Sequence, residues 1–310
     1  MSNDAGAVPL RFGGHAYQAV MVAPNYPGGP GFDDHLDLSR AAFAAGLSTW
    51  ANWRRGPGGN IDELAGNATA ADFLNAMTPY QAGGAQALQA GDLFFGFYFG
   101  HGATGPFSPG NVGEQAPALS VWDESMIFGN PSSITDDQFT AAMGAFNPGV
   151  FKFIIDISCF SGGFWNGNDV NGAGDLEQVP RTILIVSSSE LQSTYTSGIG
   201  PRPWEPLLLV RMINTLFFAP HNRNLSIAEF YARSAVAGAA INANRFDEST
   251  LPPGDALWSE IVSGDFDSSM LANFSLDELP GIGAPEPGSE ALVALGLGML
   301  ALGRLQRRKN

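Results

Sequence analysis

Residues 151–163 read FKFIIDISCFSGG, and this stretch decides how the chain is organised. Its first half is mainly apolar, aromatic or β-branched, which is typical of a strand buried on both faces of a parallel sheet. The apolar run ends at Cys159, the only cysteine of the chain, and Ser161, Gly162 and Gly163 follow as a flexible turn. A single thiol at the end of a buried strand, directly before a glycine turn, predicts a nucleophilic cysteine held in place by the sheet.

Other short apolar runs predict further strands, and amphipathic runs between them predict helices. Besides the central strand at 151–157, the expected strands are residues 15–23, 49–53, 92–100, 125–128 and 182–186. The expected helices are residues 36–46, 133–146, 206–218 and 226–244, and residues 68–88 form either one helix or a pair broken near Thr78-Pro79. Buried strands that alternate with helices are typical of an α/β fold with a mostly parallel sheet and helices on both faces.

The charge balance narrows the class of partner. The chain carries 30 Asp+Glu against 15 Lys+Arg, a net charge of -15. An acidic surface repels phosphate backbones, so no nucleic acid partner is expected, whereas cationic peptides would be attracted. Solubility alone also accounts for such a charge. A single cysteine excludes an intramolecular disulfide and a multi-cysteine metal site, and no metal site is predicted.

His101 is the second chemically useful residue at a strand end. The run DLFFGFYFG at residues 92–100 ends directly before His101 and Gly102. Ligand sites in open α/β sheets lie beyond the carboxyl ends of the strands, so adjacent parallel strands would bring this imidazole to Cys159. An imidazole takes the proton of a thiol and stabilises the thiolate, which is the competent nucleophile. The backbone N–H groups of Gly102 and Cys159 are candidates for an oxyanion hole.

Structural roles for the same residues stay open at this point. A lone cysteine on an apolar strand is often a small buried hydrophobe, and a histidine at a strand end is often only hydrogen-bonded. The serines at residues 187–189 are a third candidate site for a hydrolase, although nothing in the sequence sets a base beside them.

Two motifs resemble those of a known family. YFGHG at Tyr98–Gly102 and DISCFSGG at Asp156–Gly163 resemble the His-Gly and Asp-x-Cys-x-Ser-Gly motifs of caspase-fold cysteine peptidases. The metacaspase and bacterial caspase-like branch is nearest. The resemblance extends to Trp122–Phe139, which is similar to the acidic segment and helix start between the motifs, and to the strand and its polar end at Ile183–Tyr195. It spans roughly residues 15–245.

The resemblance implies a fold and a reaction. The fold would be a three-layer α/β/α caspase-like sandwich around a mostly parallel sheet of roughly six strands. The reaction would be hydrolysis of peptide bonds through a thioester acyl-enzyme, with Cys159 as nucleophile, His101 as base, and the Gly102 and Cys159 amides as oxyanion hole. The substrate would be a peptide or protein. Calcium dependence is common in metacaspases, but this sequence shows no residue pattern for it. Calcium is therefore possible by the resemblance only, and no other cofactor is expected.

The implied acidic pocket for a basic P1 side chain is altered in this chain. Ile157 stands two residues before the nucleophile, where the family has an aspartate, and Phe99 stands where it has a serine before the base. Asp156 lies one residue earlier, and on a regular strand it points to the opposite face. A basic P1 preference and a partly apolar pocket are therefore both open. The candidate substrate-binding residues are Asp34, Phe99, Asp156, Ile157 and Ser188.

The last 26 residues, PEPGSEALVALGLGMLALGRLQRRKN at 285–310, resemble the PEP-CTERM sorting signal of Gram-negative bacteria. This implies export, cleavage by an exosortase-like sorting peptidase, and a transient membrane tether through residues 291–305. The altered pocket and this tail also support an alternative function: a catalytically weak caspase-fold protein that serves as an exported surface or matrix interaction module.

The predicted domains follow from these segments. They are an N-terminal segment at 1–14, a peptidase domain at 15–279, a linker at 280–290, and an apolar sorting or membrane helix with a basic end at 291–310. The expected location is the bacterial envelope. Residues 1–14 lack the basic and apolar regions of a secretory signal, so a cytoplasmic location is the other expectation. Arg181, at the end of the loop at 164–180, is a candidate point of self-processing.

Overall fold

The structure is a computed structural model. It describes residues 9, 11–12, 14–26, 40–41, 43–49, 52–64, 66–104, 124–129, 132–158, 161–165, 176–186 and 260–263. The chain divides into two compact units, residues 1–279 and 280–310, and every described residue belongs to the first. Within the described ranges, no helix is both long and apolar enough to cross a membrane. The expected helices at 206–218 and 226–244, the linker and the C-terminal helix lie outside the described residues.

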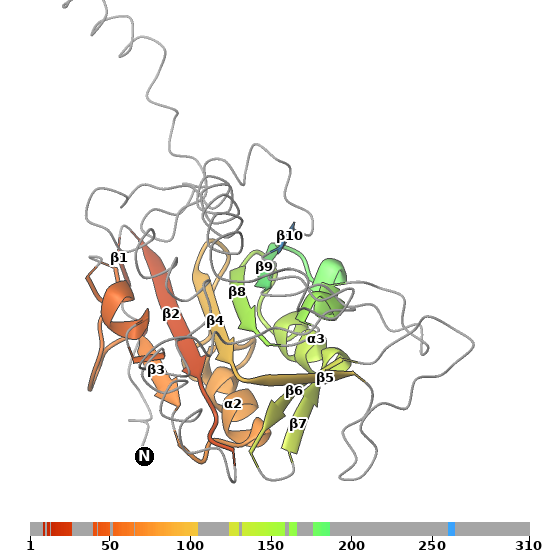
Figure 1. The fold of residues 1–310 in the computed structure, drawn as a ribbon. Coiled ribbons are helices and arrows are strands. Elements are labelled where there is room, and N and C mark those ends of the chain that lie inside the picture. The colour runs from red at the N-terminus through yellow and green to blue at the C-terminus, as the bar shows by residue number, and fades with distance from the viewer. Residues whose placement is uncertain are drawn as a thin grey trace, which may run out of the picture. The chain divides into compact units, whose positions relative to one another are not determined.

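A mostly parallel sheet forms the centre of the first unit (Figure 1). Its strands are β1 (Arg11–Phe12), β2 (His15–Val22), β3 (Ile61–Leu64), β4 (Leu93–Phe99), β8 (Phe151–Ile157), β9 (Thr182–Val186) and β10 (Glu260–Ser263). The order is β1-β2-β4-β8-β9-β10, with β3 also paired to β2. Only the edge strands β1 and β10 pair antiparallel among these described strands. The predicted α/β class is confirmed, with seven described strands where about six were expected.

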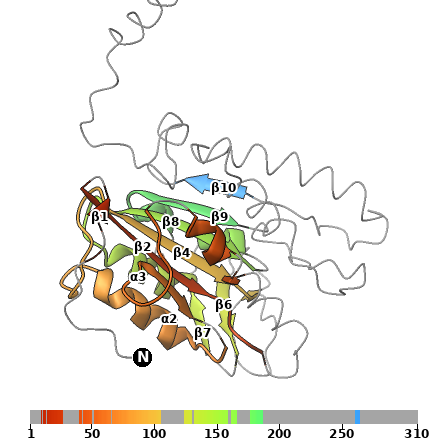
Figure 2. The same ribbon diagram turned by 90° about the vertical axis from the view of Figure 1, so that its left-hand side faces the viewer.

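Two helices, α2 (Ala70–Met77) and α3 (Asp136–Gly144), pack on one face of this sheet (Figure 2). Each begins with a capping box. A threonine hydroxyl accepts a hydrogen bond from an N–H of the first turn, and the side chain of that partner accepts one from the threonine N–H. The buried side chains of both helices share a core with Phe94 of β4 and Ile154 of β8. The short 3₁₀ turn η1 (Thr78–Tyr80) follows α2, where a proline prevents the helix from continuing.

Helical residues 43–47 pack on the opposite face. Phe43 stacks on Phe95 and Phe97 of β4, with ring centroids 5.6 and 4.8 Å apart. Successive side chains of a strand point to opposite faces, so a strand that is aromatic at nearly every position needs a cover on both sides. The structure therefore has the three layers that the sequence predicts.

A second, antiparallel sheet lies between β4 and α3 in the chain. It has the order β5-β6-β7, with β5 (His101–Thr104), β6 (Glu124–Phe128) and β7 (Ser132–Thr135). The strand expected at 125–128 is confirmed as β6. The helix expected from residue 133 is wrong at its start, because residues 132–135 pair with β6. The helix begins at Asp136, directly after the cap Thr135.

None of the described residues of the strand expected at 49–53, which are residues 49, 52 and 53, belongs to a strand. The hydroxyl of Ser48 donates to the carbonyl oxygen of Ala45 at 2.8 Å, and that of Thr49 donates to Gly46 at 2.7 Å, so both residues close the preceding helix. Trp53 is buried in the core instead of pairing in a strand. The β-branched Thr49 therefore reflects helix closure, and the aromatic Trp53 reflects burial.

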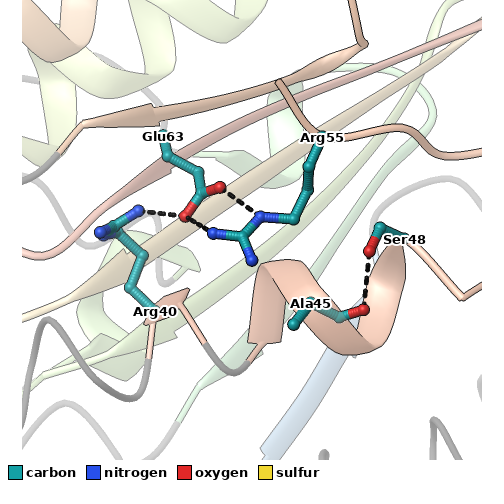
Figure 3. Close-up of polar contacts among 5 residues, drawn as sticks. All are labelled: Arg40, Ala45, Ser48, Arg55 and Glu63. Carbon is teal, nitrogen blue, oxygen red and sulfur yellow. Dashed lines mark hydrogen bonds and ion pairs between the residues drawn. The ribbon is translucent and has the colours of Figure 1, made fainter.

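The strand of this region is β3, which sequence inspection missed because its sequence, IDEL, contains two acids. Glu63 of β3 accepts hydrogen bonds from Arg55, at 2.6 Å from Nε and 3.0 Å from Nη2, and also pairs with the buried Arg40 (Figure 3). Two guanidinium groups on one carboxylate offset its partial burial. This cluster makes an acidic segment compatible with a strand inside the fold.

Candidate active site

The carboxyl ends of β4 and β8 meet at one edge of the main sheet. The strands are adjacent and parallel, and their last register pair is Phe99 with Ile157. The ladder extends one step further, because the N–H of Gly100 donates to the carbonyl oxygen of Ile157 at 3.2 Å. In the sequence, His101 lies two residues after Phe99, and Cys159 lies two residues after Ile157. Cys159 is outside the described residues, so its contact with His101 stays a prediction.

His101 is an exposed residue whose backbone is held on both sides. Its N–H donates to the hydroxyl oxygen of Tyr26 at 2.7 Å, and its carbonyl oxygen accepts from the hydroxyl of Tyr98 at 2.7 Å. The Tyr26 ring packs edge-to-face on the imidazole, with centroids 4.4 Å apart. An accessible imidazole on a fixed backbone is suited to a general base.

Gly102 is the first oxyanion-hole candidate, and it lies in β5 opposite Met126 of β6. It is half-buried. The second candidate is the N–H of Cys159, outside the described residues. The role of both amides therefore stays a prediction, supported by the place of Gly102 directly after His101.

Asp156 is fully buried at the end of β8. One of its carboxyl oxygens accepts a hydrogen bond from the Ser158 hydroxyl at 2.8 Å, and this hydrogen bond lowers the pKa of Asp156. Burial dominates and raises the pKa of Asp156 to about 7. Its register partner in β4 is Tyr98, and its neighbour Ile157 points to the other face of the strand.

The predicted substrate-binding residues do not gather into an accessible pocket in the described part of the chain. Phe99 and Ile157 are 2% and 0% exposed, and Asp156 is 0% exposed, so burial argues against direct substrate contact for all three. Their apolar neighbours explain why: the carboxyl ends of β4 and β8 are still inside the core. Asp34 and Ser188 lie outside the described residues.

Sequence inspection missed a buried carboxylate beside the glycine turn. Gly163 belongs to the 3₁₀ turn η2 (Ser161–Trp165), and Glu124 is a buried residue of β6. A Cβ atom at Gly163 would lie 2.1 Å from the carboxyl carbon of Glu124. The turn packs directly on that side chain, so an alanine at this position would force Glu124 to shift. The only signal in the sequence was the acidic segment that contains Glu124.

Arg181, the candidate for self-processing, is integrated into the sheet. Its carbonyl oxygen accepts a hydrogen bond from the N–H of Lys152 at 2.8 Å, and its guanidinium donates to Gly149 and lies 4.8 Å over the Phe151 ring. The next residue, Thr182, begins β9. Cleavage after Arg181 would require β9 to leave β8, which makes this bond a poor target in the folded protein.

Within the described ranges, no three His, Cys, Asp or Glu side chains gather in a way that could hold a metal ion. Near these strand ends, burial raises the pKa of Asp156 to about 7 and raises the pKa of Tyr98 well above its ordinary value. This edge of the sheet therefore offers an accessible imidazole at a strand end, and the acidic groups near it are buried.

Comparison with known proteins gives a structural likeness only. No protein-family model and no curated protein matches the sequence. The crystal structure of protein GSU0716 from Geobacter sulfurreducens is similar, with a TM-score of 0.53 and 14% identity over 86% of this chain and 99% of that chain. At this identity the likeness shows the fold alone.

Two insect structures are similar at lower scores. Caspase-1 from Spodoptera frugiperda has a TM-score of 0.46 and 9% identity, over 80% of this chain and 86% of that chain. Pro-sf-caspase-1 has a TM-score of 0.45 and 10% identity, over 85% and 97%.

Proposed function

We propose that the chain is a caspase-like cysteine endopeptidase with Cys159 as nucleophile and His101 as base. One observation carries this proposal: the pairing of β4 with β8. Each proposed catalytic residue follows its member of the last register pair, Phe99 and Ile157, by two residues. This spacing supports a dyad, because ligand sites of open α/β sheets lie just beyond the carboxyl ends of parallel strands.

The proposed reaction begins with transfer of the thiol proton of Cys159 to the imidazole of His101. The thiolate sulfur attacks the peptide carbonyl carbon, and the C=O electrons move to oxygen, where the Gly102 and Cys159 N–H groups would stabilise the charge. Collapse breaks the C–N bond, and the leaving amine takes the proton from the imidazolium. Water then attacks the thioester with His101 as base, which releases the acid and restores the thiol.

The surroundings of His101 support this role. His101 is exposed, whereas β4, the strand that precedes it, is buried throughout. The net charge of -15 favours the approach of cationic peptides. The burial of Phe99, Asp156 and Ile157 leaves P1 recognition to other residues of the chain.

The decisive experiment is a peptide library scanned at P1 with wild type, Cys159→Ala and His101→Gln. We expect wild type to cleave a subset of the library and each variant to lose at least about 10³-fold in rate, because either change removes one half of the dyad. Far-ultraviolet circular dichroism of the three proteins controls for folding. No cleavage by folded wild type, together with alkylation of Cys159 at the rate of a free thiol, would contradict the proposal.

One observation favours the alternative of a catalytically weak interaction module. Asp156, the one acidic substrate-binding candidate among the described residues, is fully buried and so is not available to a basic P1 side chain. If this alternative holds, folded wild type will leave the whole library intact, and Cys159→Ala will retain every binding property of wild type.

A further inference from the structure

We propose that Tyr26 and Tyr98 position the base: their hydroxyls fix the backbone of His101, and the Tyr26 ring orients its imidazole. The inference rests on the proposed function, in which His101 takes the proton of Cys159. Both tyrosines act through His101, so they are positioning residues.

The hydroxyl of Tyr26 bridges two strands of the small sheet. It accepts the N–H of His101 at 2.7 Å and donates to the carbonyl oxygen of Ile127 at 2.6 Å. His101 and Ile127 are register partners in β5 and β6. The hydroxyl therefore ties the base to the small sheet at the point where the chain leaves β4.

The hydroxyl of Tyr98 completes the arrangement from the buried side. It lies 2.7 Å from the carbonyl oxygen of His101, 2.6 Å from that of Ile127, and 3.2 Å from the Tyr26 hydroxyl. Each hydroxyl has one proton, so the Tyr26 proton serves Ile127 and the Tyr98 proton is available to His101. Burial raises the pKa of Tyr98 well above its ordinary value, so this proton is retained at neutral pH. Both polar groups of the His101 backbone then have a tyrosine partner.

The Tyr26 ring restricts the side chain of His101. The two rings meet at 71° with centroids 4.4 Å apart, an edge-to-face contact that covers one side of the exposed imidazole. An exposed side chain otherwise exchanges between rotamers. Proton transfer depends on holding the base in one geometry, so this restriction would raise the reactivity of the thiol.

Two close approaches by glycine show that the arrangement is tightly built. A Cβ atom at Gly100 would lie 2.3 Å from the Tyr26 hydroxyl oxygen and 2.5 Å from that of Tyr98. A Cβ atom at Gly129, at the turn after β6, would lie 1.8 Å from the carbonyl oxygen of Asn25. Tyr26 is thus packed against both the end of β4 and the turn of the small sheet.

The test uses the full chain, in which alkylation by iodoacetamide reports Cys159 alone because it is the only cysteine. The rate is measured against pH for wild type, Tyr26→Phe, Tyr26→Leu and the matched control Tyr80→Phe, which loses a hydroxyl bonded to Asp62 at 2.6 Å in another part of the fold. We expect an apparent thiol pKa below the free value of about 8.5 in wild type, raised by roughly half a unit in Tyr26→Phe and by about one unit in Tyr26→Leu. Tyr80→Phe should match wild type.

A second readout follows the imidazole itself by NMR of protein labelled at its four histidines. The His101 signal is assigned with His101→Gln. Phenylalanine keeps the ring of Tyr26 and its ring current, so a changed His101 signal in Tyr26→Phe reports a moved imidazole. Tyr26→Phe also keeps the test valid if Tyr26→Leu fails to fold.

The outcomes separate the two proposals. A lowered thiol pKa in wild type that is unchanged in every Tyr26 variant overturns the positioning role and leaves the dyad intact. A wild-type profile of a free thiol, unaffected by His101→Gln, overturns the proposed function, and the His101 signal then decides the positioning role. In that case an unmoved signal in Tyr26→Phe overturns it, and a moved signal supports it.

Discussion

The polar groups at the ends of β4 and β8 differ in how well hydrogen bonds satisfy them. At the end of β4, two tyrosine hydroxyls satisfy the backbone of His101 and leave its side chain exposed. At the end of β8, Asp156 is fully buried, and among the described residues only one of its carboxyl oxygens has a hydrogen-bond partner. The first end is held by hydrogen bonds, whereas the second carries an electrostatic cost that depends on pH.

The largest effect is expected at Asp156. Its pKa is raised from 3.8 to about 7, so the fold favours the protonated acid. This contribution to stability is complete below about pH 4 and is lost as the pH rises through about 7. Between pH 5 and pH 8, wild type should lose up to about 3 kcal/mol of unfolding free energy relative to Asp156→Asn. Urea unfolding at both pH values measures this difference.

Asp72→Asn is the matched control for that experiment. Asp72 is an exposed carboxylate whose pKa is lowered, chiefly by the backbone hydrogen bond from Thr69, so its contribution is lost on acidification and has the opposite sign. If wild type and Asp156→Asn show parallel pH curves, the contrast between the two strand ends is wrong.

A smaller effect is expected at the end of β4. Gly100→Ala sets a methyl group against the hydroxyls of Tyr26 and Tyr98, so the tyrosines must shift. Crowding of this kind costs about 1–3 kcal/mol of stability, and we expect it to slow alkylation of Cys159 as well. Thermal unfolding and the alkylation rate at pH 7 measure the two consequences.

Gly144→Ala is the control for the change at Gly100. It lies at the end of α3, where a Cβ atom meets nothing within 4 Å. Alanine there should leave alkylation unchanged and stabilise the helix by up to about 1 kcal/mol. Equal changes in thermal stability and alkylation rate for the two alanine variants would show that the end of β4 can accommodate a methyl group. That result would contradict the packing described above.

The smallest effect is expected from the C-terminal segment, which we propose is a sorting signal. Removal of residues 280–310 should change the unfolding free energy by less than about 0.5 kcal/mol and leave the alkylation profile unchanged. In cells, the full chain should fractionate with membranes and the shortened chain should not. A shortened chain that alkylates at a different rate would mean that the tail contributes to the β4–β8 edge.

The long apolar runs made the centre of the fold predictable. β8 was expected at residues 151–157, as observed, and β2, β4 and β9 agree with prediction to within one residue at each end. Such runs are unambiguous because both of their faces are buried. β3 escaped prediction because its acids have partners from elsewhere in the chain: Arg40 and Arg55 pair with Glu63, and the Tyr80 hydroxyl donates to Asp62.

The candidate site was predictable only in part. His101 stood out because it directly follows an apolar strand, and its exposure agrees with a chemical role. Tyr26 gave no signal, because it lies in a proline- and glycine-rich stretch of the sequence and its contact with His101 spans 75 positions. The burial of Phe99 and Ile157 also depends on packing from distant segments, which a local pattern does not reveal.

The parallel pairing of β4 with β8 has a consequence for the order of folding during synthesis. Residues 100–150 separate the two strands, so β8 leaves the ribosome only after the small sheet and α3. Until then the aromatic β4, LFFGFYF, has one edge without its final neighbour. Parallel pairing must wait for the crossover, because the entropy of closing that loop is lost before the contacts form. The edge that holds His101 is therefore completed late, and a nascent chain that stalls before residue 151 would expose an aggregation-prone strand.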